Sequence, residues 1–245
     1  ALLATMPLHA EIETDFENGN RLFEQGKYSE AVTSFESILK SGKTSAAIYF
    51  NLANTSLKLG EFGRAVYYYQ QANRLNPRDA DVRANLRFVR HEVAGAFARE
   101  ATGWQRFLRY FSIREWGFGT ALLGALWFGV MAAREWKKRW RRALFWPARI
   151  LGGGACVVGV LCFQASNSWA CADEGVVIAD QAELRPGPLM ESRVFHKLRD
   201  GEEVRVLGAK DDWVHIMDVT QRTGWLKRDK IIPLSRIGLL ESVVK

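Results

Sequence analysis

Residues 117–133 read Gly-Phe-Gly-Thr-Ala-Leu-Leu-Gly-Ala-Leu-Trp-Phe-Gly-Val-Met-Ala-Ala, a run of 17 residues without a charge. A helix of this length is about 25 Å long, which is short but sufficient to cross the hydrocarbon core of a bilayer. A second uncharged run occupies residues 150–170. The two runs predict a transmembrane helical hairpin, and the alternative is a buried helical hairpin in a soluble domain.

Tryptophan is concentrated around these two runs. Seven of the nine tryptophans of the chain lie between Trp104 and Trp169. Indole rings favour the headgroup level of a membrane. The tryptophans that flank the runs are Trp116, Trp136, Trp140, Trp146 and Trp169. A buried soluble hairpin rarely carries so many Trp and Arg residues at its ends, so this pattern favours the membrane interpretation.

The segment between the runs, residues 134–149, carries much of the net charge of +7. Six of its seven cations lie within residues 134–142, namely Arg134, Lys137, Lys138, Arg139, Arg141 and Arg142. Because basic loops remain in the cytoplasm, both ends of the chain are expected on the outer side. Each cation contributes about 1 kcal/mol near an anionic lipid surface. The loop, lying between two apolar spans, is therefore explained by membrane lipids and does not indicate nucleic-acid binding.

Residues 99–115, which precede the first span, are expected to form an interfacial helix. The apolar residues Trp104, Phe107, Leu108 and Phe111 recur at helical spacing, whereas Arg106 and Arg109 fall on another face. This pattern is typical of a helix that lies in the plane of the membrane surface. The alternative is a disordered linker.

Two segments at the ends of the chain remain. Residues 1–10 are apolar, contain a proline and end in a small residue, which is typical of the end of a secretory signal peptide. The alternative is a frayed N-terminus. Residues 234–245 form a tail without a recognisable signal.

A repeat occupies residues 12–79. A shift of 34 residues aligns Asn20 with Asn54, Gly26 with Gly60, Ala31 with Ala65 and Phe35 with Tyr69. This period and these residues resemble the tetratricopeptide repeat (TPR). The resemblance implies two helical hairpins, at residues 12–45 and 46–79, and a polar capping helix at 81–96 completes a TPR domain over 12–96. Small residues such as Gly19 and Ala53 allow close helix packing, and Phe35 and Tyr69 are expected to fill the space between helices.

The TPR resemblance also implies a peptide-binding groove lined by the first helix of each repeat. Carried over position by position, its lining is Glu13, Phe16, Asn20, Phe23, Ala47, Phe50, Asn54 and Leu57. The alternative is that Phe16 and Phe50 simply cover neighbouring helices. Some TPR domains clamp a peptide carboxylate with two Asn and several basic residues. Phe16 and Asp81 stand where Lys is required, so binding of that kind is excluded here.

Residues 174–233 change to short alternating strands with turn signals at close spacing, which predict a small all-β barrel. The segments that carry this pattern are 184–187, 198–207, 213–216, 222–226 and 231–233, and they resemble a bacterial SH3 (SH3b) domain. Trp213 and Trp225 are more often barrel core than ligand platform. The chain lacks the run of exposed aromatic residues that proline-rich peptides require.

Motifs for catalysis and cofactor binding are not apparent in the sequence. The glycines at 152–154 lie inside a predicted span and lack a following Lys-Ser/Thr, so they do not form a phosphate-binding loop. The four histidines stand in four different contexts, and the three cysteines suggest neither a disulfide framework nor a metal centre. We therefore expect no enzyme activity, no cofactor and no metal.

The expected fold class is therefore multidomain. It consists of α-helical TPR hairpins, a transmembrane α-helical hairpin and an all-β SH3-like barrel, in this order. This order resembles the BatE-type proteins of bacterial aerotolerance (Bat) operons. The resemblance implies a multi-pass scaffold in the bacterial inner membrane, with TPR and SH3b domains in the periplasm. It also implies partners, namely membrane proteins with von Willebrand-type domains and a MoxR-type AAA+ ATPase. The alternative function is a cell-envelope module that binds peptidoglycan and recruits a wall enzyme.

Overall fold

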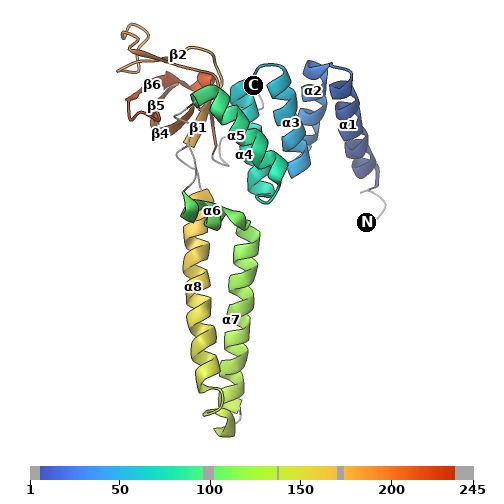
Figure 1. The fold of residues 1–245 in the computed structure, drawn as a ribbon, viewed down its shortest axis with the longest axis vertical. Coiled ribbons are helices and arrows are strands. Elements are labelled where there is room, and N and C mark those ends of the chain that lie inside the picture. Colours follow the sequence, from blue (N-terminus) through green and yellow to red (C-terminus); the bar gives the residue numbers. More distant parts are fainter. Residues whose placement is uncertain (1–5, 96–101, 137, 170–173, 235–245) are drawn as a thin grey trace. The chain divides into compact units, whose positions relative to one another are not determined.

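The computed structural model describes residues 6–95, 102–136, 138–169 and 174–234. The chain divides into two compact units (Figure 1). One unit combines residues 1–100 with residues 171–245, and the other contains residues 101–170. We call residues 6–95 the repeat domain, residues 174–234 the β domain, and residues 102–169 the hairpin unit.

The repeat domain consists of five helices. They are α1 (Met6–Glu24), α2 (Tyr28–Lys40), α3 (Ala46–Lys58), α4 (Phe62–Leu75) and α5 (Ala80–Ala94). The turns after α1 and α3 contain Gly26 and Gly60, whose φ angles of 74° and 77° suit a residue without a Cβ. Residues 6–10, expected as part of a signal peptide, form the first turns of α1, and residues 1–5 lie outside the described residues. The expected capping helix is α5, and residue 96 is also outside them.

The core of the repeat domain lies between the paired helices, as the repeat predicts. Phe35 and Tyr69 are completely buried, which confirms their expected role as space-filling residues. A Cβ on Gly19 would overlap the ring of Phe35, so the small residue permits the close approach of α1 and α2. Burial also raises the pKa of the Tyr69 hydroxyl to about 12, which keeps that group neutral.

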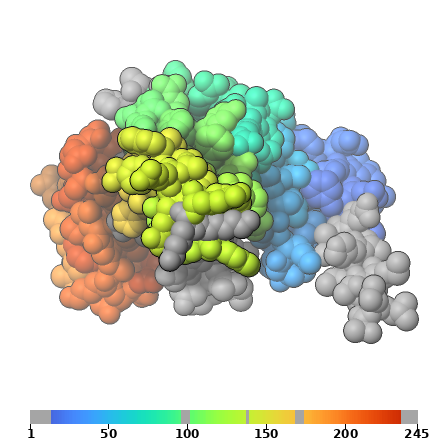
Figure 2. Space-filling view, turned by 90° about the horizontal axis from the view of Figure 1, so that it is seen from below, coloured from blue at the N-terminus to red at the C-terminus, as the bar shows by residue number. Residues whose placement is uncertain are grey.

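The hairpin unit contains α6 (Gly103–Tyr110), α7 (Ile113–Trp136), the short 3-10 helix η2 (Lys138–Trp140) and α8 (Phe145–Trp169). Residues 113–136 and 145–167 are long and apolar enough to cross a membrane. Only 6% and 11% of their apolar windows are buried in the protein, unlike the core helices of soluble proteins. Gly152 lies against Trp127, which lets α7 and α8 pack closely. Figure 2 looks onto the loop end of this hairpin, drawn in yellow-green.

Both long helices extend beyond the uncharged runs from which they were predicted. The backbone hydrogen bonds of α7 begin at Ile113 and continue to Trp136, and those of α8 begin at Phe145. Helix formation depends on the backbone, so charged and aromatic residues at the ends continue it as well as apolar ones. The loop expected at residues 134–149 is correspondingly shorter. The helix expected at 99–115 is α6, which ends before the cap of α7 at Ser112.

The β domain has seven strands, two more than the turn signals suggested. They are β1 (Glu174–Val177), β2 (Ala182–Leu184), β3 (His196–Leu198), β4 (Glu203–Lys210), β5 (Trp213–Met217), β6 (Thr223–Lys227) and β7 (Ile231–Pro233), with the 3-10 helix η3 (Arg228–Lys230) before β7. Five form an antiparallel sheet in the order β6-β5-β4-β1-β7, and β2 pairs with β3. A bridge between Arg185 and Trp225 connects the second sheet to the first. This arrangement is consistent with the expected SH3-like barrel, and its core includes Leu184, Leu198, Ile216 and Leu226.

Candidate interaction surfaces

Helices α1, α3 and α5 form one side of the repeat domain, which we call the first-helix face. Of the residues expected to line it, Phe16, Phe23, Phe50 and Leu57 are partly buried against the core of the domain. Ala47 is exposed, and the side chain of Glu13 lies outside the described residues. Much of the expected aromatic lining therefore packs between helices, and its role in binding a peptide stays a prediction.

Two asparagine pairs join the helices of the first-helix face. Asn51 Nδ2 donates to Asn20 Oδ1 at 2.7 Å, and Asn85 Nδ2 donates to Asn54 Oδ1 at 3.3 Å. The second pair is the first one shifted by 34 residues, so the repeat is preserved in its hydrogen bonds. Tyr69 also donates to Asn54 Oδ1. Because these amide oxygens bridge helices, Asn20 and Asn54 have mainly their NH₂ groups left for a ligand.

Helix α5 extends this face beyond the two repeats from which its lining was predicted. Phe88 follows Asn54 by the same 34 residues, and its side chain is 59% exposed, the highest value among the large apolar side chains described in α1–α5. Ala84 and His91 flank it on the exposed side of α5. These residues were not predicted as part of the face, because the sequence of α5 is typical of a polar cap. A third application of the 34-residue shift would have identified them.

The β domain packs against the repeat domain through apolar residues. Val176 of β1 and Leu234 after β7 are completely buried in the same apolar cluster as the core residues of α4 and α5. Arg74 of α4 donates to the carbonyl oxygen of Leu234 at 2.7 Å. A short helical array needs a cover for its last apolar surface. The β domain supplies part of that cover.

The start of α4 is joined to the β domain by a helix cap. Glu61, the N-cap residue of α4, makes no capping hydrogen bond with its side chain. The carboxylate of Asp200 instead accepts hydrogen bonds from the backbone N–H groups of Phe62 and Gly63. Burial raises the pKa of Asp200 above its ordinary value, although these two hydrogen bonds oppose the rise. A Cβ on Gly63 would overlap both this carboxylate and the carbonyl oxygen of Val177, so glycine is required there.

A largely buried ion pair also joins the two domains. Arg90 of α5 donates to both carboxylate oxygens of Glu203 in β4, from Nε at 2.9 Å and from Nη2 at 2.6 Å. Gln70 of α4 donates to the same carboxylate. The two charged side chains are only 21% and 11% exposed. Because such a pair is expensive to separate, it fixes the register between the two domains.

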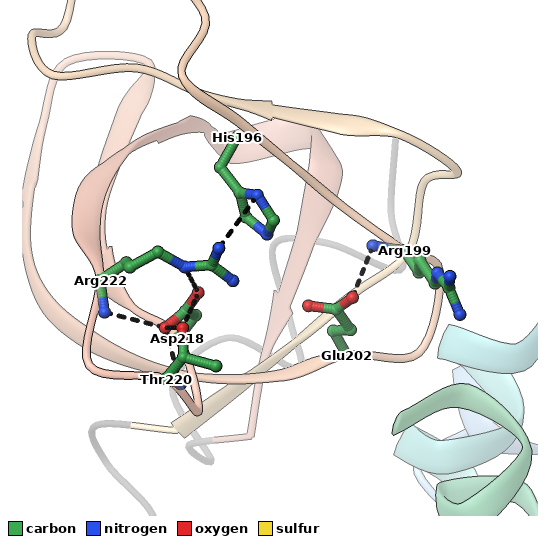
Figure 3. A network of polar contacts seen from close by, with 6 residues as sticks. All are labelled: His196, Arg199, Glu202, Asp218, Thr220 and Arg222. Atoms are coloured by element: carbon green, nitrogen blue, oxygen red, sulfur yellow. Dashed lines mark hydrogen bonds and ion pairs between the residues drawn. The ribbon is translucent and has the colours of Figure 1, made fainter. Parts of the chain in front are cut away.

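A cleft of about 540 Å³ opens where the C-terminal end of α5 meets the β domain. Its polar lining, part of which is drawn in Figure 3, includes Arg90, Glu92, His196, Lys197, Arg199, Glu202, Glu203, Thr220 and Arg222. Three of the seven charged lining residues are in ion pairs, Arg90 with Glu203 and Arg222 with Asp218. The remaining charges have both signs, so the cleft favours neither an anion nor a cation.

Asp218 organises the turn between β5 and β6 beside this cleft. Its carboxylate, with 1% of the side chain exposed, accepts hydrogen bonds from Thr220 and Arg222 (Figure 3). Burial alone would raise the pKa of Asp218, but these hydrogen bonds outweigh it and lower the pKa below its ordinary value. Arg222 Nη1 lies 3.3 Å from His196 Nδ1. All of these contacts stabilise a turn, and none leaves an acid and a base poised for catalysis.

The two tryptophans of the β domain differ in burial, because Trp213 is only 9% exposed whereas Trp225 is half-buried. Val214, Ile216 and Leu226 point into the barrel core, so by alternation Trp213 and Trp225 occupy the outer face of β5 and β6. Trp225 stacks on His215 with ring centroids 4.8 Å apart. Trp225 and His215 therefore form a partly exposed aromatic pair on the outer face of the β domain.

The basic loop of the hairpin unit is exposed where it is described. Arg139, Arg141 and Arg142 are exposed, and Arg134 is half-buried. Arg141 pairs with Glu135 at 2.7 Å on the surface. Lys137 and the side chain of Lys138 lie outside the described residues. Within the described parts of the chain, no group of three or more His, Cys, Asp or Glu side chains could hold a metal ion.

Comparison with protein families identifies the two domains of the first unit. Residues 22–84 match the family model of the tetratricopeptide repeat. Residues 179–232 match that of the bacterial SH3 domain. The chain thus joins helical N-terminal TPR repeats, two apolar helices and a C-terminal SH3b-like domain, and both matched domain types are typical of protein–protein interaction or cell-wall binding.

Proposed function

We propose that the protein is a membrane-anchored adaptor without enzyme activity. Its repeat domain would bind a peptide segment of a partner protein, and its β domain would supply a second contact. The observation that carries this proposal is the combination of two interaction domains in one compact unit with an apolar helical hairpin in the same chain. Two sites held at a fixed separation bind one partner more tightly than either site alone.

The proposed membrane arrangement follows from the charges around the hairpin. Helices α7 and α8 would both cross the bacterial inner membrane, with the basic loop in the cytoplasm and both domains in the periplasm. Reporter fusions after Ala98, Arg139 and Lys245 test this arrangement. The first and third are expected outside and the second inside. A signal from Arg139 on the same side as Lys245 would overturn it.

The order of domains supports a role in an aerotolerance or stress complex of the Bat type. In that setting the partners would be membrane proteins with von Willebrand-type domains and a MoxR-type AAA+ ATPase. The first-helix face offers Ala47 and Phe88 as exposed contact points for such a partner. Its half-buried aromatic residues would supply apolar contacts alongside the amide groups of Asn20 and Asn54.

Site-specific photo-crosslinking tests the adaptor proposal. A benzophenone amino acid at position 47 or 88 has a reach of only a few ångströms and so reports on the first-helix face alone. We expect both positions to capture the same membrane protein of the von Willebrand-type class. The matched control is position 33 on α2, where Thr33 is equally exposed on the opposite helix layer. Capture of the same protein from position 33, or of different proteins from positions 47 and 88, would contradict a peptide groove.

A second function, peptidoglycan binding, is favoured by the aromatic pair on the outer face of the β domain. Flat aromatic rings such as Trp225 can stack on ligand groups, and bacterial SH3 domains include cell-wall binders. Sedimentation of the full chain in mild detergent with purified sacculi tests this function. Binding that is lost in Trp225→Ala and kept in Phe88→Ala would support it. Absence of the protein from the sacculus pellet would remove it.

A further inference from the structure

Helix α6 has two opposite faces of different chemistry. At 100° per residue, Trp104, Phe107, Leu108, Tyr110 and Phe111 fall on one arc of the helix, which we call the apolar arc. Gln105, Arg106 and Arg109 fall on the opposite arc, the polar arc. Thr102 and Gln105 close the start of the helix with a capping box, which defines α6 as a helix separate from α7.

One side of the apolar arc is fixed to the hairpin. Leu108 is 3% exposed and packs in one apolar cluster with Trp116 of α7 and Ala165 of α8. The indole N–H of Trp116 donates to the carbonyl oxygen of Leu108 at 3.1 Å. Phe111 packs against the same cluster. These contacts hold α6 across the end of the hairpin that lies opposite the basic loop (Figure 1).

The rest of the apolar arc is only partly covered by protein, although Phe107 touches the ring of Trp116. Trp104, Phe107 and Tyr110 are 53%, 45% and 48% exposed, and they continue the exposed apolar surface of α7 and α8. Side chains of this kind, with an apolar body and in two cases a polar tip, favour the boundary between headgroups and acyl chains. Arg106 on the polar arc is exposed and then faces the headgroups and water, whereas Arg109 is half-buried.

We propose that α6 is a third membrane contact, an in-plane helix whose apolar arc enters the outer leaflet of the bilayer that the hairpin crosses. This inference rests on the proposed membrane arrangement, because it needs α7 and α8 to be inserted. The orientation of α6 supports this proposal, because the arc that contacts the hairpin also carries the exposed aromatic residues. A helix lying across the hairpin with that arc toward the spans has its polar arc away from the membrane.

Cysteine labelling of the full chain in lipid nanodiscs tests this inference. Both surfaces of a nanodisc are open to water, so a membrane-impermeant maleimide reaches every site that lipid does not cover. Phe107→Cys and its matched control Arg106→Cys are made with Cys156, Cys162 and Cys171 replaced by Ser. Each rate is normalised to that of the same variant unfolded in guanidinium chloride. We expect Phe107→Cys to react roughly tenfold more slowly than Arg106→Cys, because only the apolar arc is covered.

Equal normalised rates at positions 106 and 107 would overturn the inference. A third protein that keeps only Cys156, which is exposed on α8, separates this failure from that of the spans. If Cys156 is protected while position 107 reacts freely, the hairpin is inserted and α6 is not. If Cys156 also reacts freely, the membrane arrangement itself is wrong.

Tryptophan quenching provides a second measurement that does not depend on cysteine variants. Lipids brominated near the headgroup quench indoles at the membrane boundary. The emission of the wild-type chain minus that of Trp104→Phe isolates Trp104, and this difference is expected to be quenched. The matched difference for Trp225→Phe, in the β domain, is expected to be unaffected. An unquenched Trp104 difference would contradict the insertion of α6.

Discussion

The carboxylate of Asp200 in the β domain caps helix α4 of the repeat domain at the backbone of Gly63. The two residues are far apart in the sequence, and helix α4 has no side-chain cap of its own from Glu61. The two domains are therefore joined by a backbone interaction as well as by apolar contact. In the proposed adaptor, a partner that engages one domain would meet the other in a fixed position.

Removal of the cap tests this coupling. Asp200→Ala leaves the first N–H groups of α4 without their acceptor, which typically costs about 1 kcal/mol. We expect the free energy of unfolding of the full chain in detergent to fall by that amount, as measured by denaturant titration. Asp229→Ala, at an exposed residue of the same domain, is the matched control and should change little. Equal stability of the two variants would show that Asp200 does not act as a cap.

Gly63→Ala tests the close approach of the domains. The added Cβ overlaps the carbonyl oxygen of Val177 and the Asp200 carboxylate, and overpacking of this kind costs about 1–3 kcal/mol. We expect lower stability and faster proteolysis at the junction of the domains. Gly208→Ala adds the same methyl group in open space in the β domain and is expected to be tolerated. If Gly63→Ala is as stable as Gly208→Ala, the two domains do not pack as described.

The raised pKa of Asp200 gives a pH dependence of defined sign. Because its folded pKa lies above the ordinary value of 3.8, the folded protein binds this proton more tightly than the unfolded chain. The stability contribution of Asp200 is therefore fully present below pH 3.8 and decreases as the pH rises through the folded pKa. Asp200→Asn keeps an acceptor oxygen but cannot ionise. Relative to this variant, the wild type should lose stability with rising pH, and a constant or opposite difference would refute the assignment.

The Arg90–Glu203 pair is expected to contribute much more than a surface pair. Arg90→Ala leaves the largely buried Glu203 carboxylate with Gln70 alone and is expected to cost about 2 kcal/mol. The double variant Arg90→Met with Glu203→Leu should be more stable than Arg90→Ala, because no buried charge is left unpaired. Arg141→Ala, which removes an exposed pair with Glu135, should cost at most about 0.5 kcal/mol. Equal losses of unfolding free energy for Arg90→Ala and Arg141→Ala in denaturant titrations would contradict this prediction.

The repeat and the barrel could be predicted because their signals are local and periodic. The 34-residue shift located Phe35 and Tyr69 in the core, and strand alternation located the barrel segments. The third helix was predicted as a cap, but its contribution to the first-helix face was missed, because Phe88 replaces the asparagine that marks the two preceding units. Trp225 was expected in the barrel core but is half-buried on the outer face, because a large apolar residue does not reveal which side of a strand faces the core.

The interface between the domains could not be predicted from these patterns. Asp200 and Gly201 have the sequence of an ordinary turn, and Val176 has that of an ordinary strand residue. Contacts between segments far apart in the chain leave no periodic signal. One local feature did hint at the interface. Gly63 stands in the first turn of a helix, where a residue with a side chain is more favourable unless another chain segment approaches closely.

Alkaline carbonate extraction of native membranes tests the membrane anchorage of the adaptor most directly. Carbonate removes proteins bound only by charge or by other proteins, whereas transmembrane helices remain with the lipid. We expect the full chain to stay in the membrane pellet and to enter solution only when detergent is added. Release of the intact chain into the carbonate supernatant would show that α7 and α8 do not cross a bilayer.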